Sequence, residues 1–277
     1  MSFSVNTNTG AMTALQYLNQ TQGQLNQTQS EINSGLKVAT AKDNGAIYAI
    51  AQNQRGAVAG LQSVINSLHN GSSSIDVALS AGQSISDLLI QLKQQALSAS
   101  DSSLDTASRQ ALNASFQALL SQITTIVSNA TFNGCNLVNG STNQITALAS
   151  SDGSRHITTQ AQNMSLSGTV VTISAAASIS TQASASALIS TIQTSLTNVD
   201  SALAKLSSGS AKFSIQATFT QNLSDTLTTG IGNLVDANMA QESAQLQSLQ
   251  VKQQLGIQAL SIANQAPQTI LSLFQNG

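Results

Sequence analysis

Few residues of this chain could take part in metal or acid–base chemistry, and their spacing does not bring them together. His69 and His156 are the only histidines, and Cys135 is the only cysteine. No HExxH, CxxC or similar ligand spacing occurs, so we interpret the histidines as exposed polar residues rather than zinc ligands. No glycine-rich phosphate loop follows a strand either. We therefore expect no catalytic residue, no cofactor and no bound metal.

Cys135 stands within the turn-like sequence FNGCNLVNG. A thiol becomes reactive when a neighbouring cation lowers its pKa, and no Lys, Arg or His adjoins this one. We interpret Cys135 as a small, partly buried filler, and a reactive thiol is the alternative.

The composition favours helices over a large compact core. Charged residues make up 7% of the 277 residues, aromatic residues 3%, and the net charge is -2. Globular domains carry about a quarter charged residues. With so few aromatic side chains, the composition fits long helices that pack along seams of Leu, Ile, Val and Ala better than it fits a large compact core. Nucleic-acid binding has no basic patch to support it, and no stretch of about 18 apolar residues supports membrane insertion.

Both ends of the chain are uncharged, residues 1–30 and 253–277, and both read as amphipathic helices. Termini of soluble proteins are usually charged and solvated, so we predict that these helices pair and that the chain polymerises through them. The residues predicted to carry polymerisation are Leu15, Leu18, Leu25, Ile32, Leu246, Leu249, Leu255, Leu260, Leu273 and Phe274. The single proline, Pro267, is expected to interrupt the last helix.

Apolar residues at three- and four-residue spacing continue between the two ends and predict coiled-coil packing. One seam spans residues 58–96 and another spans residues 189–234. After the first seam, Ser102 and Asp105 have the spacing of a capping box, which predicts a new helix beginning there.

The middle of the chain, residues 131–184, has a different texture. Asn-Gly at 133–134 and 139–140 and Asp-Gly at 152–153 supply the positive φ that tight turns need. Short β-branched segments such as 169–173 predict small hairpins. The Ser/Thr-rich composition, with few large apolar residues, predicts a solvent-facing tip. The whole pattern predicts a mainly α fold: long coiled-coil helices from both chain ends form a rod, with a small β-hairpin-containing central segment.

Four stretches carry a recognisable pattern: SGLKVATAKDNGA at 34–46, the FNG and LVNG turns within 132–140, DANMAQES at 236–243 and ALSIANQAPQTILSLF at 259–274. They resemble bacterial flagellin, most closely the short flagellins of alphaproteobacteria. The resemblance covers residues 1–140 and 185–277, and the middle of the chain is variable in this family.

The resemblance implies three layers. Residues 1–34 and 236–277 would form the inner terminal coiled coil of a filament core, which lines an export channel. Residues 35–140 and 185–235 would form a helical rod domain in the outer tube. Residues 141–184 would form a variable, solvent-facing β/loop segment.

The resemblance also implies the function of a structural subunit that polymerises into the flagellar filament for swimming motility. Its implied partners are other copies of itself, hook-associated and cap proteins, a cytoplasmic flagellin chaperone and the flagellar export apparatus. The N-terminal sequence MSFSVNTNTG lacks the basic and apolar regions of a signal peptide. We therefore expect an extracellular protein that is exported without a cleaved signal peptide.

Three other functions are alternatives. A hook-filament junction protein of similar build would share the same terminal helices. An enzyme would need a site, and the sequence offers none. An adhesin module could occupy residues 141–184.

Hydroxyl groups on the outside of flagellins of this type carry O-linked sugars, and the resemblance extends this expectation to the central segment. The candidates for O-glycosylation are Ser141, Thr142, Ser150, Ser151, Thr158, Thr159, Ser165, Ser167, Thr169, Thr172 and Ser174. We interpret the Asn-X-Ser/Thr sequences as chance occurrences in a chain rich in these residues.

Overall fold

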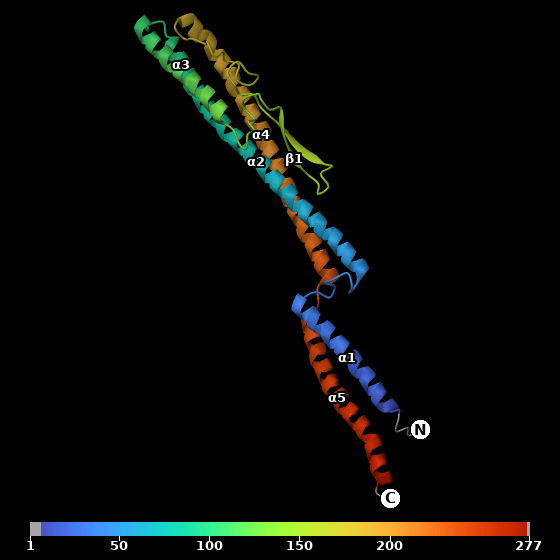
Figure 1. Ribbon diagram of the computed structural model, residues 1–277. Helices are drawn as coiled ribbons and strands as arrows, with labels where there is room; N and C mark the ends of the chain where they lie inside the picture. The colour runs from blue at the N-terminus through green and yellow to red at the C-terminus, as the bar shows by residue number, and fades with distance from the viewer. Residues whose placement is uncertain (1–6, 276–277) are drawn as a thin grey trace. The chain divides into compact units, whose positions relative to one another are not determined.

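The computed structural model describes the backbone of residues 7–275 and the side chains of residues 7–265. Its elements, labelled in Figure 1, are α1 (Thr9–Ser34), α2 (Gly45–Ala99), α3 (Thr106–Asn129), β1 (Gln144–Leu148), β2 (His156–Gln160), α4 (Gln182–Val235) and α5 (Met239–Gln275). The predicted mainly α fold, with long helices at both ends and a small β-hairpin between them, is confirmed.

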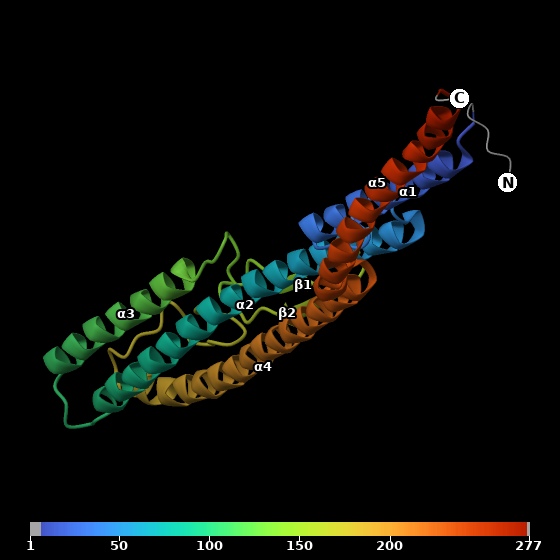
Figure 2. The same ribbon diagram turned by 90° about the horizontal axis from the view of Figure 1, so that it is seen from below.

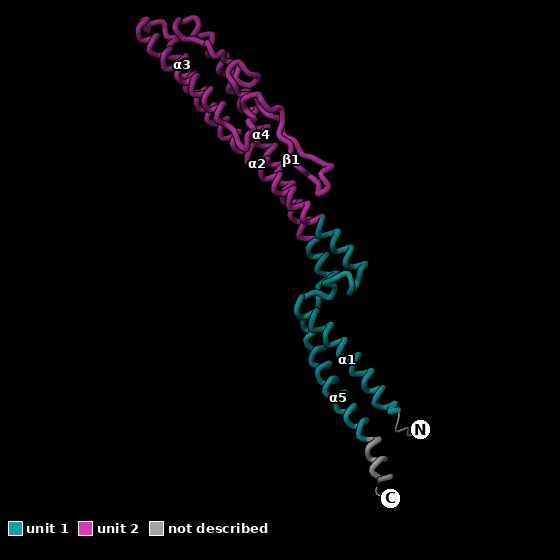
Figure 3. Tube along the Cα trace, viewed as in Figure 1, with its two compact units in different colours: residues 1–56, 227–277 teal, residues 57–226 magenta. Residues whose placement is uncertain are grey.

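Packing divides the chain into two compact units, which Figure 3 shows in different colours. Unit 1 comprises residues 1–56 and 227–277, and unit 2 comprises residues 57–226. The division falls within α2 and α4, whereas the sequence placed the limits of the inner coiled coil at residues 34 and 236. Those sequence limits refer to layers of a filament, and they stay a prediction.

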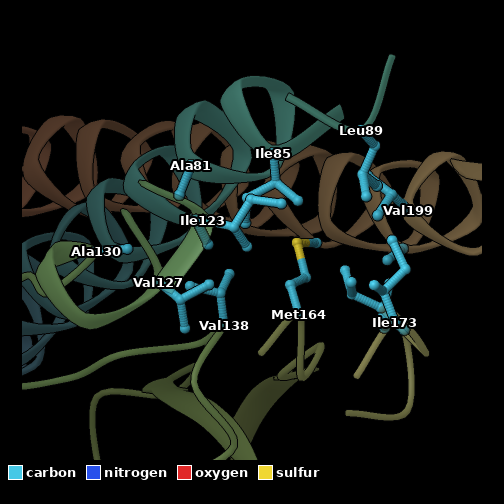
Figure 4. Close-up of a cluster of buried hydrophobic side chains, with 14 of the residues drawn as sticks. Ala81, Ile85, Leu89, Ile123, Val127, Ala130, Val138, Met164, Ile173 and Val199 are labelled. Carbon is cyan, nitrogen blue, oxygen red and sulfur yellow. The ribbon is translucent and has the colours of Figure 1, made fainter. Parts of the chain in front are cut away.

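Unit 2 is built on α2, α3 and α4, which run alongside one another in both ribbon views (Figures 1 and 2). Figure 4 shows Ile85 of α2, Ile123 of α3, Val199 of α4 and Met164 of the central segment converging in its core. All four side chains are fully buried. The apolar seams read from the sequence therefore close on one continuous cluster.

Three glycines bring the partners of α2 unusually close. Gly60, Gly71 and Gly82 recur every eleven residues, about three helical turns, and so share one face of α2. A Cβ at Gly71 would lie 2.3 Å from Cε1 of Phe213, and one at Gly82 would lie 2.7 Å from Cδ2 of Leu203. A Cβ at Gly60 would lie 2.8 Å from a backbone oxygen of the β1–β2 turn. This face accepts only a residue without a side chain.

The segment between α3 and α4 lies along the helices of unit 2, which differs from the predicted tip (Figures 1 and 2). Its apolar residues are few, but most of them are buried in the core of unit 2 or packed against it. Those buried in the core are Leu137, Val138, Ala147, Met164, Val170, Val171, Ile173, Ala177 and Ile179. They do not follow a helical or strand period, so the sequence pattern did not reveal them.

The turns within this segment are confirmed. Gly134, Gly140 and Gly153 have φ values of 78°, 79° and 72°, in the left-handed region that glycine adopts without strain. Strands β1 and β2 pair antiparallel with Gln144 opposite Gln160.

Residues 169–173 do not form the expected hairpin strand. Val170, Val171 and Ile173 are buried against the helices. The backbone N–H of Thr172 donates to Oγ of Ser195 at 3.1 Å in place of a strand partner. These β-branched residues pack in the core of unit 2 and do not form part of a sheet.

The predicted start of the third helix at Ser102 is wrong by three residues. Asp105 is the N-cap of α3, and its side chain accepts the N–H of Ser108 at 2.7 Å. Ser102 lies in a preceding turn, where Asp101 accepts the N–H of Ser103. Asp and Ser are comparable N-caps, and here the aspartate caps the helix while the serine belongs to the turn before it.

Replacement of Gly71 by alanine should destabilise unit 2. Alanine is the better helix former, but its Cβ would overlap the ring of Phe213, and such overpacking typically costs about 1–3 kcal/mol. Gly56→Ala is the matched control in α2, because a Cβ there meets nothing within 4 Å. Urea unfolding followed by circular dichroism should show Gly71→Ala less stable and Gly56→Ala stabilised by up to about 1 kcal/mol. Equal effects of the two variants would contradict the close-packing argument.

Candidate functional site: the terminal helix pair

Helices α1 and α5 pair side by side within unit 1 and run in opposite directions (Figures 1 and 2). Leu25 of α1 and Leu249 of α5 are buried, with 6% and 3% of their surfaces exposed. Leu18 rests on Gly256, where an added Cβ would lie 3.3 Å from Cδ1 of the leucine. The predicted pairing of the two terminal helices is confirmed.

A short backbone bridge sets where α1 ends relative to α5. Gly35 closes α1 in the left-handed conformation at φ 70°, and its N–H donates to the carbonyl of Glu31 at 2.8 Å. The chain then bonds to the end of α4, where the N–H of Lys37 donates to the carbonyl of Val235 at 2.7 Å. The N–H of Ala237 donates to the carbonyl of Gly35 at 2.9 Å. These bonds hold the end of α1 beside the end of α4 and the start of α5.

The residues predicted to carry polymerisation fall into three groups. Buried between the helices are Leu25 and Leu249; half-buried are Leu18, Ile32, Leu246 and Leu260; exposed are Leu15 and Leu255. Leu273 and Phe274 lie outside the residues whose side chains are described. The heptad seam read from the sequence therefore mostly joins the two helices of one chain, and only its flanks face outward.

A second set of apolar residues on the same helices is exposed, and we call it the outward apolar set. Its members are Met12, Leu15, Tyr17, Val251, Leu255, Ile257 and Ile262, each between 47% and 69% exposed. The sequence analysis placed Leu15 and Leu255 among the polymerisation residues and read Ile257 and Ile262 as part of the apolar run of the last helix, but it did not single out Met12, Tyr17 or Val251. A signal was available, since Val251, Leu255 and Ile262 share one face of α5.

The charged residues of the terminal pair are Glu31, Glu242 and the exposed Lys252, and the two acidic residues lie near the bridge. Burial raises the pKa of the Glu242 carboxyl above its usual value, the neighbouring Glu31 raises it further, and Lys37 opposes both. Oε2 of Glu242 is buried without a hydrogen-bond partner. Two acidic groups thus meet where α1 ends and α5 begins, and burial with like charge makes ionisation of Glu242 less favourable there.

Helix α5 continues through Pro267 to Gln275, so the predicted interruption is wrong. Proline has no N–H to offer the carbonyl four residues earlier, which belongs to Ala263. Nδ2 of Asn8 donates to that carbonyl at 2.7 Å. The hydrogen bond that proline removes is supplied from the other end of the chain.

The residues with possible chemistry are not brought together. His69 and His156 are exposed, and Cys135 is half-buried in a turn, where its backbone pairs with Phe132. Among the residues that the structure describes, no group of three or more His, Cys, Asp or Glu side chains could hold a metal ion. No helix within the same residues has the length and apolar character needed to cross a membrane.

The candidate glycosylation residues differ in how far their hydroxyl groups can be reached. Exposed are Ser141, Ser151, Thr158, Ser167, Thr169, Thr172 and Ser174, and half-buried are Thr142, Ser150 and Ser165. Thr159 is buried, and its Oγ1 would lie 2.6 Å from a Cβ added at Gly209 of α4. Its hydroxyl is therefore closed off in the folded chain.

Comparison with known proteins gives one consistent family. The family model of the bacterial flagellin N-terminal helical region matches residues 5–143, and that of the C-terminal helical region matches residues 189–274. The flagellin FljM of Caulobacter vibrioides is 50% identical over 272 residues, which cover 98% of both chains. A flagellin of Brucella melitensis is 34% identical over 281 residues, covering 98% of this chain and 99% of its own. The crystal structure of Bacillus cereus flagellin aligns with 55% of this chain and 86% of its own, at 17% identity and a TM-score of 0.48.

Replacement of Glu242 by glutamine should stabilise the folded chain at neutral pH. The raised pKa means that Glu242 ionises less readily in the folded chain than in the unfolded chain. The cost of charging Glu242 is therefore absent below the unfolded value of 4.5, appears as the pH rises above it, and is complete above the folded value. Thermal unfolding should show Glu242→Gln more stable than the parent at pH 7 and equal to it at pH 4. Asp87→Asn, on an exposed position of α2, is the control that removes a carboxylate elsewhere. A stabilisation by Glu242→Gln that persists unchanged at pH 4 would refute the explanation.

Proposed function

This chain belongs to the bacterial flagellin family, and from that membership we propose that it polymerises through the outward apolar set of α1 and α5. The members of the family are structural subunits of the flagellar filament, not enzymes. The filament role of the chain rests on these relationships. The assignment of contacts to named residues is the proposal.

The observation that carries the proposal is the exposure of large apolar side chains on both terminal helices. Seven residues of the set have about half or more of their surface open to solvent in the single chain. Exposed apolar side chains that gather on one face, as Val251, Leu255 and Ile262 do on α5, mark a place where another protein packs. Because α1 carries no charge before Glu31 and α5 none after Lys252, neighbours can bury these faces without desolvating an ion.

The terminal pair should gain order when subunits assemble. Among the described residues of α1 and α5, the fully buried side chains are Leu25, Thr28 and Leu249, which is little burial for two helices. Helices held by so few contacts are marginal in water and are stabilised mainly by packing. We therefore expect fast amide exchange in α1 and in α5 up to residue 265 in the monomer, and slow exchange in the polymer. Slow exchange of both helices in the monomer would contradict this expectation.

Leu255→Gln should raise the concentration needed for polymerisation by tenfold or more. Full burial of a leucine side chain contributes about 1.5–3 kcal/mol, and each ~1.4 kcal/mol changes an equilibrium tenfold. Gln254→Ala is the matched control, since Gln254 is an exposed polar neighbour on the same helix. Sedimentation of seeded polymerisation measures the critical concentration, and circular dichroism checks that unit 2 stays folded. Polymerisation of Leu255→Gln at the parent's critical concentration would remove this residue from the proposed interface.

We propose further that the same surface determines the chain's other partners. A cytoplasmic chaperone would cover the apolar face of α5 before assembly, because that face is open in the single chain. The flagellar export apparatus would export the chain without cleaving a signal peptide. Cap and hook-associated proteins would contact the terminal helices of the subunits at the ends of the filament. Capture of these partners by the parent chain and not by a chain lacking residues 245–277 would support the proposal.

Glycosylation of the central segment is the last part of the proposal. We assign it to the exposed hydroxyls among the candidates and leave out Thr159, whose side chain packs on Gly209. Acidic sugars there would add charge to a nearly neutral surface and limit lateral bundling of filaments. Intact-mass measurement of native filaments decides the matter. A mass equal to the bare chain of 28.4 kDa would eliminate the modification.

A further inference from the structure

One side chain at the start of α1 bonds to both terminal helices. Oδ1 of Asn8 accepts the N–H of Ala11 at 3.0 Å and so caps α1. Nδ2 of the same side chain donates to the carbonyl of Ala263 in α5 at 2.7 Å. The two halves of one amide group thus serve two different helices.

The carbonyl that Asn8 reaches is chemically special. In an α-helix each interior carbonyl accepts the N–H four residues ahead, and for Ala263 that position is Pro267, which has none. The chain contains one proline in all. Ala263 is therefore the one interior carbonyl of α5 whose own helical donor is missing.

The pairing of α1 and α5 needs a specific register for a physical reason. Charged residues at the flanks of a coiled coil ordinarily fix how two helices align, and most of this pair has none. A shift of one heptad, about 10 Å, would move Gln22 from Gln253 to Leu246 or Leu260, and Leu18 from Gly256 to Leu249 or Ala263. These contacts and the backbone bridge at Gly35 favour the observed alignment from one end of the pair, and a directional bond at the other end would add to them.

We propose that Asn8 and Pro267 form a register lock. The proline creates a single free acceptor in α5, and the Asn8 amide satisfies it only when the helices are aligned as observed. Two other contacts agree with this alignment: Leu18 rests on Gly256, and Nε2 of Gln253 donates to Oε1 of Gln22. The lock acts within one chain, so it goes beyond the proposed polymer contacts and does not depend on them.

Thiol cross-linking tests the lock directly. In a Cys135→Ser background, the pair Gln22→Cys with Gln253→Cys reports the observed register, and Gln22→Cys with Leu246→Cys or Leu260→Cys reports a shift of one heptad. A short bis-thiol reagent is applied to filaments, and intrachain products are identified as cross-linked monomers after denaturation. Asn8→Asp keeps the capping oxygen but loses the donor, and Asn8→Ser is its neutral counterpart.

With Asn8 and Pro267 intact, the 22–253 product should predominate. Asn8→Asp and Asn8→Ser should raise the ratio of shifted to observed product about fivefold, the factor that one hydrogen bond of typical strength supplies. Pro267→Ala restores the internal donor and should raise the ratio as well, and the Asn8→Asp, Pro267→Ala double variant should show no further rise.

Gln20→Ala, at an exposed position of α1, is the control that should leave the ratio unchanged. If a variant does not polymerise, the same cross-links are measured in the soluble monomer. Unchanged ratios in the Asn8 variants, or independent effects of Asn8 and Pro267 that multiply in the double variant, would overturn the lock. A failure of Leu255→Gln to impair polymerisation would leave it standing, so the two proposals fail separately.

Discussion

The antiparallel pairing of α1 with α5 is the interaction on which the rest of unit 1 depends. It brings the two chain ends together and consumes the inner seam around Leu25 and Leu249. A pair of helices can bury only the faces that meet, so apolar residues on the other faces stay open. The outward apolar set consists of residues that the α1–α5 contact does not bury. In a polymer, neighbouring subunits can cover these residues on every subunit.

Unit 2 has a core large enough to be stable without neighbouring subunits, whereas unit 1 does not. Its core contains the large side chains Phe116 and Phe213, both fully buried, and the central segment adds Met164 and Ile173. The Gly71 and Gly82 positions let α4 and its side chains approach α2 closely, which increases packing where aromatic residues are scarce. Stability therefore concentrates in unit 2, and the terminal pair can respond to assembly.

The sequence predicted the elements that have a period and missed those that do not. Helical seams, the pairing of the ends and the Asn-Gly turns follow from spacing and local conformation, and the structure confirms them. The central segment was harder, because Val170 and Ile173 pack on helices without forming a strand. At the site, heptad spacing found the inner seam but not Val251 or Tyr17, since which apolar face remains open depends on the partner helix. Pro267 was misjudged because its missing hydrogen bond is supplied by Asn8, 255 residues away in the sequence.

The scarcity of charge in the terminal helices changes how their pairing can be made specific. Ion pairs would fix the alignment, but charges buried between neighbouring subunits would have to be desolvated, and the attraction often fails to offset that cost. Neutral groups avoid the cost only if each donor finds an acceptor. The α1–α5 pair uses shape and single hydrogen bonds instead of charges. Leu18 packs on Gly256, and the side-chain amides of Gln22 and Gln253 bond to each other. The carbonyl of Ala263, which Pro267 leaves without a helical donor, accepts a hydrogen bond from Asn8. The two acidic residues of the pair, Glu31 and Glu242, lie beside the bridge from α4, where burial and like charge raise the pKa of Glu242, and the one basic residue, Lys252, is exposed.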